Sequence, residues 1–122
     1  MITLTLPFPP SVNTYYRHLP NGRTLLSRKG RLFKAFASEL PEFQPFAAED
    51  RLRVHLQLFP PTRRSFDIDN YGKSVLDLLQ SAGVFPNDNQ VDEFYVERRE
   101  VVSGGKSIVT IERLWGLKRG DD

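Results

Sequence analysis

Three aspartates and one lysine in the middle of the sequence are residue types that can act together on a phosphate group. Asp67 and Asp69 stand two positions apart, Lys73 follows them, and Asp88 comes shortly after an apolar-periodic run that ends at Gly83. Carboxylates are hard oxygen ligands that suit Mg²⁺ or Mn²⁺, and grouped carboxylates repel one another unless a cation lies between them. A bound cation would activate water and stabilise the charge that develops on a phosphate during displacement. The sequence therefore predicts a metal site formed by the three aspartates, with Lys73 beside it.

The convergence of Asp67 and Asp69 depends on where the following helix begins. Two side chains at positions i and i+2 diverge inside a helix, whereas extended backbone points them to the same side. We therefore predict that the helix begins at or after Asp69. Ordinary structural roles remain open as well: Asp67 or Asp69 as a helix cap only, and Asp88 as part of an Asx-turn only.

Two other interpretations of the same motif fit less well. In a calcium-binding loop that starts at Asp67, Gly72 falls correctly at the sixth position, but Tyr71 occupies a ligand position and Leu78 replaces the bidentate glutamate. In a phosphatase with an aspartate nucleophile, the Asp67-x-Asp69 pair should directly follow a buried parallel strand, whereas residues 60–66 intervene. Both classes are therefore disfavoured.

Composition describes an ordinary globular protein. The 122 residues are enough for one domain, 1–122, and 39% of them are hydrophobic while 26% are charged. The absence of cysteine excludes disulfides and thiolate chemistry, and two separated histidines make a zinc site unexpected. No apolar run approaches the roughly 20 residues of a membrane span and no signal peptide is evident, so a cytoplasmic protein without membrane association is expected.

The first third of the chain is strongly basic, although the net charge of the whole chain is only +2 and the first acidic residue is Glu39. A polyanionic partner such as nucleic acid is the natural hypothesis, although solvated lysines and arginines are also common. Tyrosines beside cations can stack on bases, but adjacent tyrosines also fit at the rim of a core. The candidate nucleic-acid contacts are Asn13, Tyr15, Tyr16, Arg17, Arg23, Arg28, Lys29, Arg31, Arg63 and Arg64.

Hydrophobic periodicity predicts the elements that must position these residues. Strands are expected at 2–8, 24–26, 52–59, 91–102 and 108–112. One helix is expected over residues 28–40 with Ser27 as N-cap, and another from Asn70 to a stop at Gly83. Irregular structure is expected at 11–22 and 42–50, and no regular element is predicted from Leu114 onward.

The apolar residues of the two predicted helices indicate how the layers pack. The expected buried stripes are Leu32, Phe33, Phe36, Ala37 and Leu40 in the first helix and Tyr71, Val75, Leu76, Leu79 and Ala82 in the second. The turn 103–106 should join the last two strands as a hairpin. The predicted fold is an α+β, two-layer single domain, in which two helices pack on one face of a small mixed β-sheet that ends in a C-terminal β-hairpin.

Four segments in this order resemble one family, the RusA-type Holliday junction resolvases. They are residues 6–17 (LPFPPSVNTYYR), residues 27–34, residues 63–70 (RRSFDIDN) with Lys73 and Asp77 after them, and residues 83–92. The likeness extends from about Ile2 to Glu112. It implies a homodimeric, Mg²⁺-dependent endonuclease, with no small-molecule cofactor, that places paired nicks in four-way DNA junctions during recombination and repair in a bacterium or phage.

The resemblance also implies roles for individual residues. Asp67, Asp69 and Asp88 match the metal-binding catalytic carboxylates, and Lys73 matches the catalytic lysine. Asn87 departs from the family pattern, in which a second aspartate often stands at that position; its neutral carbonyl oxygen is still a possible ligand. Asp77 is one helical turn beyond Lys73 and is expected to orient its ammonium group.

Other functional classes remain open at this stage. A non-catalytic nucleic-acid-binding module would need only the basic residues, and a metal-dependent phosphatase would use the same carboxylates on small esters. The paired cuts of a resolvase favour a two-fold dimer. Apolar residues available for an interface include Phe43, Phe46, Phe59 and Trp115.

Overall fold

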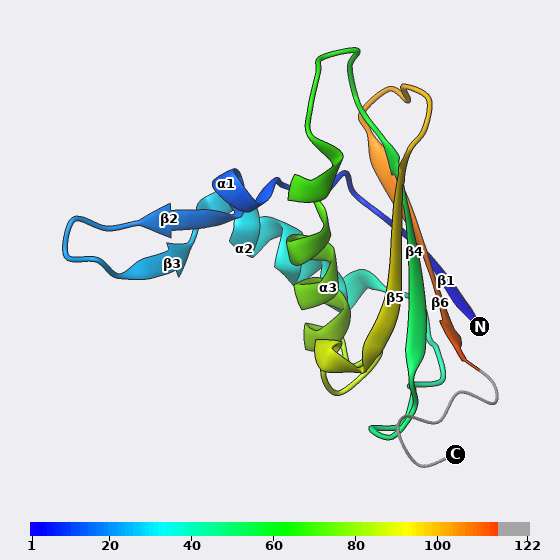
Figure 1. Cartoon of the computed structure of the whole chain (residues 1–122). Helices are drawn as coiled ribbons and strands as arrows, with labels where there is room; N and C mark the ends of the chain where they lie inside the picture. The colour runs from blue at the N-terminus through cyan, green and yellow to red at the C-terminus, as the bar shows by residue number, and fades with distance from the viewer. Residues whose placement is uncertain (115–122) are drawn as a thin grey trace.

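A four-stranded mixed sheet forms one layer of the protein, as seen in the computed structural model, which describes residues 1–114. The strand order is β1 (Ile2–Leu6), β6 (Lys106–Arg113), β4 (Leu52–Phe59) and β5 (Val91–Arg98). The β1–β6 and β6–β4 pairs are antiparallel, and β4–β5 is parallel. The helices lie on one side of this sheet (Figure 1), which confirms the predicted α+β fold.

The core lies between the sheet and two helices, α2 (Arg28–Ala35) and α3 (Gly72–Ser81). Every second residue of β4 from Leu52 to Leu58 is fully buried, as the alternating pattern predicts. From α3, the buried side chains are Val75, Leu78 and Leu79. The other face of the sheet is polar, and His55 pairs there with a glutamate of β5 at 2.8 Å.

The last two strands do not form the predicted hairpin, because β4 lies between them. The chain passes from β4 through α3 into a parallel β5 at the sheet edge, so β6 occupies the opposite side of β4. Residues 99–105 cross the end of β4, where Arg99 N donates to Leu58 O and Val102 N donates to Pro60 O. The predicted turn near 103–106 is therefore present, but the strands before and after it, β5 and β6, are not neighbours in the sheet.

A separate two-stranded arm projects from the body (Figure 1). It consists of β2 (Tyr16–His18) and β3 (Thr24–Leu26), which pair antiparallel after the short helix α1 (Val12–Tyr15). The prediction of irregular structure at 11–22 is therefore wrong in part. The segment is regular because β2 and β3 bond to each other, a pairing that no alternation of apolar residues marks.

Helix α2 begins as predicted, since the Ser27 side chain accepts a hydrogen bond from Gly30 N. It ends sooner than predicted and continues as the 3₁₀ helix η1 (Phe36–Glu39). Leu32, expected in the buried stripe, is 63% exposed. The reason is that α2 turns Gly30 and Phe33 inward, and Gly30 packs against α1.

Three of the apolar residues considered for an interface pack against the core, namely Phe43, Phe46 and Phe59, and of these Phe43 and Phe46 stay partly exposed. Trp115 and the segment after Leu114 lie outside the described residues. No helix within residues 1–114 is long and apolar enough to cross a membrane.

Candidate functional site

Asp67 and Asp69 lie just before α3, on a segment that is not α-helical. Asp67 is extended (φ −89°, ψ 120°), and the short 3₁₀ helix η2 (Ile68–Asn70) connects it to α3, which starts at Gly72. The prediction that the helix begins at or after Asp69 is confirmed for α3, and Asp69 itself lies in η2. Both aspartates are exposed, and the Asp67 side chain makes no capping hydrogen bond. Asp67 is therefore not used as a helix cap.

Lys73 is held by Asp77, one turn further along α3. Lys73 Nζ lies 3.2 Å from Asp77 Oδ1, and the hydroxyl of the buried Tyr15 donates to Asp77 Oδ2 at 2.9 Å. Asp77 thus bridges a cation and a buried phenol, so the contact expected between Asp77 and Lys73 is present. The hydrogen bond to Asp77 raises the pKa of Lys73 above its ordinary value, and the charge of Asp88 adds a smaller contribution.

Tyr15 was predicted as a nucleic-acid contact, and its position contradicts that prediction. The ring is fully buried, so it cannot stack on a base in this structure. Burial first, and then the hydrogen bond to Asp77, raise the pKa of Tyr15 well above its ordinary value. The phenol therefore stays protonated and remains a hydrogen-bond donor to Asp77.

Asp88 begins the 3₁₀ helix η3 (Asp88–Gln90), beyond the other end of α3. Its backbone N donates to Gln80 Oε1 at 2.9 Å, so the last turn of α3 fixes the start of η3. The Asp88 carboxylate is half-buried and close enough to Lys73 to influence its pKa.

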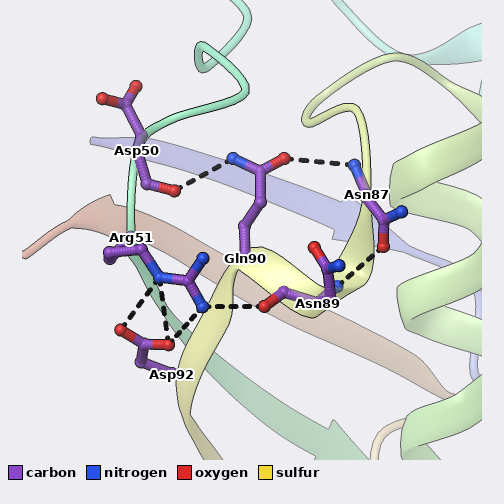
Figure 2. Close-up of polar contacts among 6 residues, drawn as sticks. All are labelled: Asp50, Arg51, Asn87, Asn89, Gln90 and Asp92. Carbon is purple, nitrogen blue, oxygen red and sulfur yellow. Dashed lines mark hydrogen bonds and ion pairs between the residues drawn. The ribbon is translucent and has the colours of Figure 1, made fainter. Parts of the chain in front are cut away.

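A buried glutamine that the sequence did not single out holds η3 in place (Figure 2). Gln90 Oε1 accepts from Asn87 N at 3.1 Å, and Gln90 Nε2 donates to Ala47 O at 2.8 Å and to Asp50 O at 2.9 Å. Asn87 Oδ1 in turn accepts from Asn89 N at 2.9 Å, which completes a capping box. Gln90 thus attaches the turn that carries Asp88 to the loop before β4. Residues 83–92, which include Gln90 and resemble the family, were the sequence signal that could have pointed to it.

The structure does not bring the three predicted metal ligands together. Within residues 1–114, no three carboxylate or imidazole side chains are placed to hold one metal ion. Helix α3 has ten residues, which span about 15 Å. It separates Asp67 and Asp69, before its first turn, from Asp88, after its last. The carboxylate oxygens of these aspartates suit a hard cation such as Mg²⁺. Within residues 1–114 of a single chain, however, the three carboxylates do not meet at one point.

The other candidate nucleic-acid contacts are largely on the surface. Tyr16 is half-buried and Arg31 Nη1 donates to Leu26 O at 2.9 Å. The remaining candidates are exposed, and they lie in α1, on the arm, on α2 and in the loop after β4: Asn13, Arg17, Arg23, Arg28, Lys29, Arg63 and Arg64.

Comparison with known proteins gives the same family as the four sequence segments indicate. A family model described as "Endodeoxyribonuclease RusA" matches residues 7–112. The crossover junction endodeoxyribonucleases RusA of Shigella sonnei strain Ss046 and Escherichia coli strain K12 are each 32% identical over 114 residues, covering 92% of this chain and 94% of the relative. The protein of the same name from Enterobacteria phage 82 is 32% identical over 113 residues, covering 91% of this chain and 93% of the relative. The chain therefore belongs to the RusA endodeoxyribonuclease family.

Proposed function

We propose that this protein is a Mg²⁺-dependent endodeoxyribonuclease that resolves four-way DNA junctions by paired symmetric nicks, in the cytoplasm of a bacterium. The family match supports a nuclease, and the names of the relatives support a crossover junction as substrate. The observation that carries the proposal is the fixed Lys73–Asp77 pair, with Asp88 nearby, at positions that match the family motif. An ammonium group held beside carboxylates is suited to an anionic phosphodiester.

Asp67, Asp69 and Asp88 are the proposed ligands of the divalent cation, with Mn²⁺ as a substitute for Mg²⁺. When bound, the cation would supply an activated water molecule and stabilise charge on the scissile phosphate. Because α3 separates Asp88 from the other two, we assign no coordination geometry to them. Isothermal titration with Mg²⁺ or Mn²⁺ on the free protein and on its junction complex tests this ligand set, and Asp67→Asn should weaken cation binding in the complex.

Lys73 is proposed to stabilise negative charge on the scissile phosphate or on the leaving 3′ oxygen. Its pKa is raised by Asp77, so the side chain remains a cation at neutral pH and acts through charge. Asp77 is a positioning residue, because it restrains Lys73 Nζ through a bond that lies on the helix surface. Lys73→Met should then lower cleavage much more than junction binding.

The exposed cations of the arm, α2 and the loop after β4 are proposed to contact DNA phosphates. Each phosphate neutralised should contribute about −0.9 to the slope of log affinity against log salt concentration. Fluorescence anisotropy of a labelled four-way junction between about 50 and 200 mM salt measures that slope. An affinity that does not change with salt would contradict these contacts.

A homodimer is proposed because two symmetric strands must be cut and a two-fold assembly carries two active sites. Sedimentation at micromolar concentration tests it, and a purely monomeric protein would contradict it.

The decisive experiment compares a synthetic four-way junction, a linear duplex and a chromogenic phosphate ester, each with and without Mg²⁺. Nicking of the junction alone supports the proposal, binding without cleavage supports a non-catalytic module, and ester turnover supports a phosphatase. Asp67→Asn and Asp69→Asn should abolish nicking and leave junction binding intact. Glu49→Gln, an exposed acid-to-amide change in the loop before β4, is the matched control. Unchanged nicking in the Asp67 or Asp69 variants would refute the assignment.

A further inference from the structure

A groove of about 890 Å³ lies between residues 7–14, α2 and residues 60–71, and Asp67 forms part of its wall. This volume is within the range of about 300–1,000 Å³ that is typical of small-molecule sites. The groove is therefore large enough to receive a single nucleotide beside one of the proposed catalytic carboxylates.

Three aromatic rings gather in the wall of the groove. Phe66 and Tyr71 have ring centroids 5.1 Å apart, Phe8 and Tyr71 5.4 Å, and Phe8 and Phe66 5.9 Å. All three side chains remain partly exposed. Arg98 lies over the Phe66 ring, 4.4 Å from its centroid, and also donates to Phe66 O, so this ring is fixed in position.

Leu32 lines the same groove as the aromatic rings, and it is 63% exposed. It was expected in the core, and its exposure at this place leaves an apolar wall open to solvent. Solvent-exposed apolar walls beside rigid rings are suited to the flat face of a base, because every base presents a π-face.

The polar groups of the groove match a nucleotide rather than an apolar partner. Lys29 and Arg64 line it, and neither forms an ion pair with residues 1–114. The side-chain amides of Asn13 and Asn70 also line it, and they make no hydrogen bond within the described chain. Two unneutralised cations attract phosphate, and amide groups can pair with the edges of a base.

We propose that this groove binds one unstacked nucleotide of the junction, next to the phosphate that is cut. The proposal rests on the proposed nuclease function and adds a substrate feature to it. The base stacks against the rings and Leu32, its flanking phosphates meet Lys29 and Arg64, and the backbone is thereby directed past Asp67. Bases at a branch point are the least costly to unstack, because the stack is already interrupted there.

The test uses a set of four-way junctions, each with one 2-aminopurine within a few nucleotides of the branch point. The fluorescence of this base analogue rises when it leaves the stack. Unmodified protein, in EDTA and at saturating concentration, should raise the fluorescence at one position in each of the two strands that the two-fold dimer would cut, and at no other position. Leu32→Gln should abolish that rise, and Phe66→Leu should lower junction affinity at least fivefold, since stacking on one ring contributes about 5- to 150-fold.

Leu25→Gln is the matched control, because Leu25 is also an exposed leucine but lies on the arm, outside the groove. Thermal melts confirm that each variant is folded. If Phe66→Leu fails to fold, Leu32→Gln at its exposed position still decides the question.

The outcomes separate this proposal from the proposed function. Fluorescence that rises and is lost only in Leu32→Gln supports the groove, whether or not the unmodified protein nicks DNA once Mg²⁺ is added. Nicking without any fluorescence rise overturns the groove and leaves the nuclease intact. Loss of the signal in Leu25→Gln alone assigns unstacking to the arm and overturns the groove. A change in oligomeric state in Leu32→Gln, with fluorescence unchanged, also overturns it, because the groove then receives a second copy of the chain.

Discussion

The Gln90 side chain connects the turn that carries Asp88 with the loop before β4, and its removal should destabilise the whole fold. Gln90 is only 2% exposed and makes three hydrogen bonds, one accepted from Asn87 N and two donated to the carbonyls of Ala47 and Asp50. Each such bond contributes about 0.5–1.5 kcal/mol net. Gln90→Ala should therefore lower the free energy of unfolding by about 2–4 kcal/mol, which for a chain of this length corresponds to a fall in Tm of about 8–15 °C.

Urea and thermal unfolding of the variant and the unmodified protein measure this difference. Gln44→Ala is the matched control, because Gln44 is exposed in the same region and makes no hydrogen bond within residues 1–114. A surface change of this kind should stay within about 0.5 kcal/mol of the unmodified protein. If Gln90→Ala is no less stable than Gln44→Ala, the assignment of Gln90 as a buried connection is wrong.

A near-isosteric change at the same position adds a dependence on pH. In Gln90→Glu, the side chain still accepts from Asn87 N, but its carboxylate cannot donate to the carbonyls of Ala47 and Asp50. Burial and these carbonyls should raise the pKa of the introduced carboxyl above the ordinary value of about 4.3. When the pKa of a carboxyl is higher in the folded than in the unfolded protein, the folded state is favoured while the carboxyl is protonated. This advantage is lost as the pH rises above the unfolded pKa. The destabilisation of Gln90→Glu should therefore grow from about pH 4 upward. Unfolding curves that show a constant difference across this range would contradict it.

Two further predictions concern contacts of α2 and α3. Tyr15→Phe removes the hydroxyl that donates to Asp77 and should cost about 1–2 kcal/mol of stability in denaturant unfolding; a change below 0.5 kcal/mol would refute the bond. Gly30→Ala places a Cβ 2.4 Å from the backbone oxygen of Tyr15, and should cost about 2–3 kcal/mol because backbone cannot yield locally. Gly72→Ala places its Cβ 2.6 Å from the ring of Phe94, an exposed side chain that can turn aside, so its cost should be clearly smaller, and equal losses in the two glycine variants would contradict this comparison.

The sequence alone determined the features that depend on neighbouring residues. Alternation located β4, because the side chains of a strand point to opposite faces, and helical spacing located α3 with its stop at Gly83. Ser27 marked the start of α2 through a hydrogen bond three residues away. The Lys73–Asp77 pair was predictable for the same reason, since residues four apart lie on one face of a helix.

Only the tertiary structure decided which distant residues meet. Local periodicity does not encode the position of a strand in a sheet, so β5 and β6 were expected as neighbours although β4 separates them. The same limit applies to single residues. Tyr15 is buried because it meets Asp77, and Leu32 is exposed because α2 turns its glycine toward α1. Asp88 lies apart from Asp67 because the two residues flank opposite ends of the ten-residue helix α3. The sequence names residues able to bind metal and phosphate, but packing between segments far apart in the chain sets the distances among them.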